Sequence, residues 1–136
     1  MNTQKNRIAM ISLIMIIVLS SFITLAGAQT NVALEKPASQ STTDYDGVAG
    51  RAVDGNTAGN WRGGSVTHTD HNFPTAWWEV DLEGNFDVSS IEIYNRSDDC
   101  CWDRLEGAVL SVLDENRTEV YSQTLTGVST APIIFS

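Results

Sequence analysis

After Thr30 the chain shows no sustained apolar spacing at i, i+3, i+4 and i+7, the pattern that an amphipathic helix requires. Short runs of β-branched and aromatic residues recur instead, separated by clusters of Gly, Asp, Asn and Ser that favour turns. Trp78, Val80 and Leu82 occupy alternate positions of one such run, which predicts a strand with one face toward a core. The predicted fold class is therefore all-β. The expected strands span residues 31–34, 76–82, 88–94, 107–113, 119–125 and 133–135.

The first 28 residues have the pattern of a leader. Lys5 and Arg7 precede an almost unbroken apolar run from Ile8 to Ala26, and small residues follow it at 26–28. This order predicts a secretory signal peptide over residues 1–28, cut before Gln29. The alternative is an uncleaved membrane anchor, because the run approaches the roughly 20 residues that span a bilayer.

The charge of the remaining chain excludes some classes of partner. The sequence has 17 acidic and 8 basic residues, a net charge of −9, and loss of Lys5 and Arg7 with the leader makes it −11. Such a surface repels phosphate backbones and anionic lipids, so we expect no nucleic-acid partner and no membrane insertion once the leader is removed. Residues 29–136 are then one secreted, extracellular domain in which a disulfide can persist.

Two stretches of this domain depart from the strand pattern. The segment from Ser41 to Phe73 is long and rich in Gly, Asp, Asn and Thr, apart from an expected helical turn over 48–53, and such a loop is usually functional. At the other end, residues 130–136 resemble an apolar strand with nothing after it to cover it. About six strands are expected where a two-sheet sandwich has seven or eight, so we expect the C-terminal strands to be missing.

The sequence Asp54-Gly55-Asn56, with Ser65 further on, offers hard oxygen ligands in a loop. Calcium prefers six to eight oxygens from carboxylates, amides and carbonyls. The alternative is an ordinary turn, because Asp, Asn and Gly are also common turn residues.

Cys100 and Cys101 are adjacent and are the only cysteines of the chain. In an exported protein they can pair with each other, pair with another chain or stay free. A bond between neighbours closes no long loop, so its purpose would be local: a rigid apolar surface rather than global stability.

Charged residues surround the cysteine pair. Arg96 and Arg104 are fixed donors that, beside acidic groups, can form a fork for hydroxyl or carboxylate oxygens. The alternative is a surface ion-pair cluster. His68 and His71, on either side of Asp70, could be metal ligands or a general base, but no nucleophile or complete zinc set accompanies them, so no catalysis is predicted.

The sequence resembles the fucolectin-type (F-type) lectin domain of the discoidin-like and coagulation-factor C-domain group. Six matching blocks occur in order, and the cysteine pair lies at the expected place. The blocks are residues 31–42, 52–56, 64–69, 77–82, 91–96 and 100–108.

The resemblance implies an antiparallel jelly-roll β-sandwich that binds an L-fucose-like sugar with the help of calcium and without catalysis. It implies that the arginine and histidine side chains hydrogen-bond the sugar, that a Cys100–Cys101 disulfide packs against its ring, and that an aromatic side chain lies near its methyl group. The implied sugar-binding residues are His68, Arg96, Arg104, Cys100, Cys101 and Trp61.

The resemblance also implies a calcium site and an orienting acid. The implied calcium ligands are the side chains of Asp54, Asn56 and Ser65 and the backbone carbonyl of Arg51. One extra residue precedes the cysteines here, so the orienting acid is either Asp98 or Asp99. The family's last acidic calcium ligand lies in the part expected to be missing, which predicts a weakened calcium site.

The expected partners are fucosylated glycans or glycoproteins. The domain is expected to bind them as a homo-oligomer or as part of a multidomain parent protein. Two alternatives remain open. The domain could be a discoidin-type module for another glycan or a protein ligand, or it could be the N-terminal targeting module of a larger secreted glycoside hydrolase.

Overall fold

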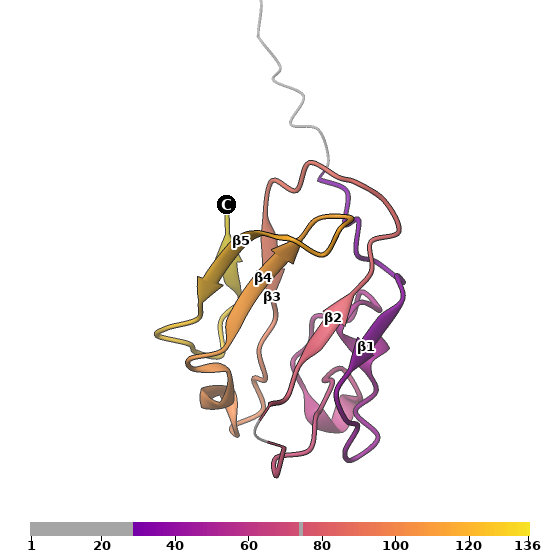
Figure 1. Cartoon of the computed structure of the whole chain (residues 1–136). Helices are drawn as coiled ribbons and strands as arrows, with labels where there is room; N and C mark the ends of the chain where they lie inside the picture. The colour runs from indigo at the N-terminus through magenta and orange to yellow at the C-terminus, as the bar shows by residue number, and fades with distance from the viewer. Residues whose placement is uncertain (1–28, 74) are drawn as a thin grey trace, which may run out of the picture.

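The computed structural model describes residues 29–73 and 75–136, and in these ranges it contains six short strands and three turns of 3-10 helix (Figure 1). The strands are β1 Ala38–Gln40, β2 Trp78–Val80, β3 Ile91–Ile93, β4 Val109–Leu113, β5 Glu119–Thr124 and β6 Ile133–Phe135. The helical turns are η1 Ala49–Ala52, η2 Trp61–Gly63 and η3 Trp102–Leu105. The all-β prediction is confirmed, whereas the predicted signal peptide lies outside the described residues.

The strands form three antiparallel pairs: β1 with β2, β3 with β6, and the hairpin β4 with β5. In Figure 1 the β1–β2 pair lies to one side and the β4–β5 hairpin to the other, with β3 behind β4. The hairpin changes register between Val112 and Leu113, because Leu113 pairs with Glu119 whereas Val112 pairs with Tyr121. The described residues contain no helix long and apolar enough to cross a membrane.

The prediction of a strand over 31–34 is wrong. Asn31 instead closes a turn, since its side-chain oxygen accepts from the N–H of Ala33 at 3.0 Å and its carbonyl accepts from the N–H of Leu34 at 3.4 Å. Asparagine side chains commonly compete for the backbone in this way. The strand that pairs with β2 begins later, at Ala38.

The buried apolar side chains lie in connecting segments. Val53 follows η1, while Leu125 and Val128 follow β5. The alternation predicted for β2 is only partial, because Trp77 is 49% exposed and Trp78 is half-buried, but Glu79 is half-buried too. The indole N–H of Trp78 donates to the carbonyl of Ala49 at 3.0 Å, which holds η1 against β2.

Apolar side chains are exposed on the other two strand pairs. Val109, Val120 and Ile134 are each more than half exposed. The loops around Gly47, Gly59, His68 and Ser97, by contrast, pack on one another through backbone hydrogen bonds. These loops and the turn after them carry most of the predicted site.

Candidate functional site

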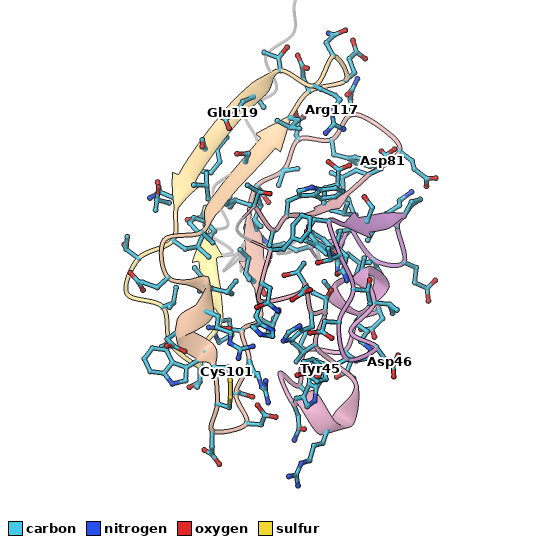
Figure 2. All side chains as sticks on the ribbon, turned by 60° about the horizontal axis from the view of Figure 1, so that its bottom comes forward. Tyr45, Asp46, Asp81, Cys101, Arg117 and Glu119 are labelled. Atoms are coloured by element: carbon cyan, nitrogen blue, oxygen red, sulfur yellow. A yellow bond between two sulfur atoms is a disulfide. The ribbon has the colours of Figure 1, made fainter. Side chains whose placement is uncertain are left out.

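Three loops meet at one end of the molecule and line an open pocket of about 230 Å³. Figure 2 shows the two sides of this end, with Tyr45 on one and Cys101 on the other. The pocket, called here the His68 pocket, is lined by Tyr45, Trp61, His68, Arg96, Cys100, Cys101 and Arg104. Six of these seven are the residues predicted to bind a sugar, and Tyr45 is the addition.

His68 and Arg104 touch across the pocket, with Nε2 of His68 and Nη1 of Arg104 3.1 Å apart. A guanidinium can only donate, so Nε2 accepts this hydrogen bond and the ring proton is on Nδ1. Nδ1 is buried and has no partner among the described residues. A ring protonated on both nitrogens would place two donors face to face, so this pairing requires the neutral ring.

The backbone around His68 is held by a distant loop. Its N–H donates to the carbonyl of Gly47 at 2.8 Å, and its carbonyl accepts from the N–H of Asp44 at 3.1 Å. A Cβ at position 47 would lie 2.6 Å from Cβ of His68, so only glycine permits this approach. The amide of Gln40 also donates to the carbonyls of Gly47 and His68, at 3.0 and 3.2 Å.

Aromatic rings form one wall of the His68 pocket. The rings of Tyr45 and His68 lie edge to face with centroids 5.5 Å apart, and those of Trp61 and His68 lie 5.3 Å apart. Tyr45 is 66% exposed and adopts a left-handed backbone with φ 48°. An exposed aromatic held in this costly conformation is typical of a binding loop, and it could have been suspected from its place in the long polar segment.

Asp98 orients two groups of the site. Its carboxylate accepts from Nε and Nη2 of Arg96, at 2.5 and 3.3 Å, and from the backbone N–H of Trp61 at 3.0 Å. The hydrogen bond from Arg96, more than the one from Trp61, holds the pKa of Asp98 below its ordinary value of 3.8. Of the two candidates for the orienting acid, Asp98 is therefore the one that contacts Arg96. The side chain of Asp99 is exposed and makes no hydrogen bond or ion pair with another described residue.

Trp61 reaches the pocket because its loop packs on the segment after Asn95. The N–H of Ser97 donates to the carbonyl of Gly59 at 2.8 Å, and a Cβ on Gly59 would lie 2.5 Å from the carbonyl oxygen of Asn95. The guanidinium of Arg96 lies over the indole of Trp61, with Cζ 5.4 Å from the ring centroid, a cation–π contact.

Cys100 and Cys101 are joined by a disulfide and form part of the pocket wall. Cys101 has φ 65° and precedes η3, and its carbonyl accepts from the N–H of Arg104 at 3.3 Å. The disulfide therefore lies at the turn from which η3 presents Arg104.

Asn95 ties this turn to the C-terminal segment. Its side chain is 6% exposed, and its amide nitrogen donates to the carbonyls of Trp102 and Ser129, each at 2.8 Å. Its side-chain oxygen accepts from the N–H of Arg96 at 2.7 Å. The contact with Ser129 spans 34 residues and forms only on folding, which is why inspection of its neighbours in sequence missed this positioning residue.

Of the predicted calcium ligands, Arg51 lies within η1, and Asp54, Asn56 and Ser65 follow it. The carboxylate of Asp54 accepts from the N–H of Asn56 at 2.8 Å, and the amide oxygen of Asn56 accepts from the N–H of Ala58 at 3.2 Å. Ser65 is buried, and its hydroxyl exchanges two hydrogen bonds with the backbone of Asn60. Among the described residues no hydrogen bond joins Asp54 or Asn56 to Ser65. Hydrogen bonding alone therefore does not hold these three predicted ligands together.

His71 does not join His68 in one site. It lies instead beside Asp44 and Asp70, where each of the three residues offers a ligand atom within 4.8 Å of the others. The backbone N–H of Asn72 lowers the pKa of Asp70. The two histidines that the sequence grouped as candidate ligands therefore have separate surroundings.

Comparison with known proteins places this geometry among sugar-binding domains. A family model described as a NedA-like, galactose-binding domain of the F5/F8 type C group matches residues 51–135. Fucolectin-3 of Anguilla japonica is 40% identical over 85 residues, which are 59% of this chain and 46% of that protein. The chain thus spans about half the length of the curated relatives it matches first.

Solved structures show the same similarity. A fucose-binding module of Streptococcus pneumoniae is 40% identical, with a TM-score of 0.74 over 80% of this chain and 76% of that chain. The lectin domain of lectinolysin, complexed with Lewis b antigen, is 38% identical, with a TM-score of 0.72 over 79% and 78%.

Proposed function

The chain belongs to the NedA-like, galactose-binding family of the F5/F8 type C group and is a discoidin-like F-type lectin domain, and we propose that it binds L-fucose or fucosylated glycans without catalysis. One observation carries the proposal. The six residues predicted as sugar contacts come from positions 61 to 104 of the sequence, and all of them line the His68 pocket.

The chemistry of the pocket suits fucose. Fucose is neutral, with several hydroxyls beside an apolar methyl corner. The charge of Arg96 is already balanced by Asp98, so this arginine serves as a directional donor rather than as a counter-charge. The disulfide and the aromatic wall supply the apolar surface that a small ligand needs.

A glycan array tests the ligand class, with competition by free L-fucose and by free D-galactose. Binding of fucosylated glycans that L-fucose abolishes and D-galactose leaves intact supports the proposal. The reverse competition favours a galactose-type ligand, the second candidate, which the description of the family model supports.

Calcium would act as a structural ion in the loop that leads to Trp61. The support is the donor set: Asp54 keeps one carboxylate oxygen free of hydrogen bonds within the described chain, and the oxygens of Asn56 and Ser65 each keep a lone pair. These oxygens, with the carbonyl of Arg51, are of the kind that calcium prefers, but they are fewer than six. The expected affinity is therefore low.

A chelation experiment tests the calcium proposal. Addition of Ca²⁺ should raise the melting temperature of the wild type and not that of Asp54→Asn. Asp87→Asn is the control, because Asp87 is exposed and makes no hydrogen bond with another described residue. Equal melting temperatures of the wild type with EDTA and with millimolar Ca²⁺ would overturn it.

The remaining features of the proposal concern the whole protein. The domain acts outside the cell, which the leader pattern of residues 1–28 supports. One small sugar site binds weakly, so useful affinity comes from several copies, in a homo-oligomer or in a multidomain parent. Such a parent could include a secreted glycoside hydrolase, with this domain as its targeting module.

A further inference from the structure

The sequence contains two acceptor motifs for N-linked glycans, each an asparagine followed two residues later by serine or threonine. They are Asn95-Arg96-Ser97 and Asn116-Arg117-Thr118. A glycan is bulky, so it has to lie on the surface of a folded protein. The two asparagines have opposite surroundings, and the structure therefore distinguishes between the motifs.

The chemistry of the modification adds a second requirement. The amide nitrogen of asparagine forms a bond to C1 of N-acetylglucosamine, and the bond from C1 to the diphosphate of a lipid-linked oligosaccharide breaks. The diphosphate leaves with the bonding electrons, and the amide nitrogen loses one proton. An unmodified asparagine amide has two N–H donors, so the modified nitrogen keeps only one.

Asn95 meets neither requirement. It is buried, and its amide nitrogen uses both N–H groups, in hydrogen bonds of 2.8 Å to the carbonyls of Trp102 and Ser129. A glycan would remove one of these donors and leave a carbonyl without its partner. The hydroxyl of Ser97 is also engaged, because it donates to the carbonyl of Ala58 at 3.0 Å. A chain modified at Asn95 cannot reach this folded structure.

Asn116 meets both requirements. It lies in the turn between β4 and β5, where residues 115–118 are all exposed. The carboxylate of Asp114 holds this turn by accepting from the backbone N–H groups of Asn116 and Thr118, at 2.9 and 2.8 Å. The side-chain amide of Asn116 makes no hydrogen bond with another residue of 29–73 or 75–136. It can therefore lose one N–H without the loss of a contact.

The turn also lies far from the candidate sugar site. Figure 2 shows Arg117 and Glu119 at the end of the molecule opposite Tyr45 and Cys101, two residues that line the His68 pocket. A glycan on the residue before Arg117 would extend away from the pocket, so it would leave the pocket open to a ligand.

We propose that Asn116 carries an N-linked glycan in the exported protein and that Asn95 carries none. The inference rests on the proposed export of the domain, and it is independent of which sugar the His68 pocket binds.

The test expresses the full chain with its own leader in cultured mammalian cells and analyses the protein from the medium. Peptide N-glycosidase F removes N-linked glycans and converts the modified asparagine to aspartate, which peptide mass spectrometry locates. We expect this conversion at Asn116 and not at Asn95. The enzyme should lower the apparent mass of the wild type and of Thr118→Ser, which keeps the motif, but not that of Thr118→Ala.

Ser97→Ala is the matched variant at the other motif, because it removes the acceptor sequence while it keeps Asn95 in place. Its apparent mass should fall on treatment as that of the wild type does. Removal of the glycan from the wild type should change the affinity for L-fucose less than twofold, measured by calorimetry, since the modified turn lies away from the pocket.

A glycan on Asn95, or an exported chain with Asn116 unmodified, would overturn the inference. Retention of the chain inside the cells with its leader uncut would overturn the proposed export and, with it, this inference. A glycosylated chain that does not bind L-fucose would overturn the proposed function alone and would support the assignment of Asn116.

Discussion

His68 and Arg104 lie 36 residues apart in sequence and meet in one hydrogen bond at the centre of the site. Two separate segments of the chain hold this hydrogen bond in place. One is the loop around Gly47, which pairs with the backbone of His68, and the other is the turn at Cys101, which begins η3. Each support can be altered separately, and each makes a prediction.

Gly47→Ala should displace His68. The added Cβ would lie 2.6 Å from Cβ of His68 and 2.7 Å from its backbone nitrogen, so one of the two loop segments must move. We expect at least tenfold weaker binding of L-fucose, measured by calorimetry, together with a lower melting temperature. Gly50→Ala is the matched control, because a Cβ there meets nothing within 4 Å. Equal effects of the two substitutions would contradict the close approach.

Loss of the Cys100–Cys101 disulfide should affect binding and leave stability nearly unchanged. The bond joins neighbours and closes no long loop, so chain entropy gives it little weight in the free energy of unfolding. The free energy of unfolding of a double Cys→Ser variant should lie within about 0.5 kcal/mol of the wild-type value, since substitutions away from the core usually change it by no more than that. Its affinity for L-fucose should fall, because the apolar wall and the turn before Arg104 are both changed. Unchanged affinity would show that the disulfide is not part of the sugar contact.

Asn95→Ala should destabilise the domain by about 1 to 3 kcal/mol, the range for leaving buried hydrogen-bonding groups unsatisfied. The substitution removes both donors to the carbonyls of Trp102 and Ser129. Chemical denaturation measures the effect. Asn116→Ala, in the exposed β4–β5 turn, is the control and should stay within about 0.5 kcal/mol of the wild type.

The pairing of Asp98 with Arg96 predicts a dependence on pH. The folded pKa of Asp98 is lowered, so its ionised carboxylate stabilises the fold fully above the ordinary value of 3.8 and ceases to do so as the pH falls through the depressed folded pKa. The difference in melting temperature between the wild type and Asp98→Asn should therefore be constant from pH 5 to 7 and shrink below pH 3.8. A difference that shrinks already near pH 6 would assign the stabilisation to another group.

The sequence pointed to this region because an adjacent cysteine pair is unusual. The flanking arginines also had an ordinary explanation, a surface ion-pair cluster, and the family resemblance implied their roles. The supports of the site were not accessible in this way. Gln40 lies 28 residues from its partner His68, and Asn95 lies 34 residues from Ser129, so neither contact follows from local spacing.

Local chemistry also explains the wrong or undecided predictions. The apolar pattern at 31–34 suggested a strand, but the side-chain oxygen of Asn31 accepts a hydrogen bond from the N–H of Ala33 and holds a turn there instead. The sequence alone could not tell which of Asp98 and Asp99 contacts Arg96, because the two are adjacent residues of the same type. The folded loop brings the carboxylate of Asp98 to Arg96, and the next residue, Asp99, adopts a left-handed backbone with φ 63°.

The binding of L-fucose in the His68 pocket is tested most directly by calorimetric titration of the wild type, His68→Ala and Arg104→Ala with the free monosaccharide. His71→Ala and Arg117→Ala are the matched controls, because both residues lie outside the pocket. We predict saturable binding by the wild type and both controls, and at least a tenfold loss in His68→Ala and in Arg104→Ala. Wild-type affinity in either pocket variant, or no binding of L-fucose by the wild type, would contradict the account.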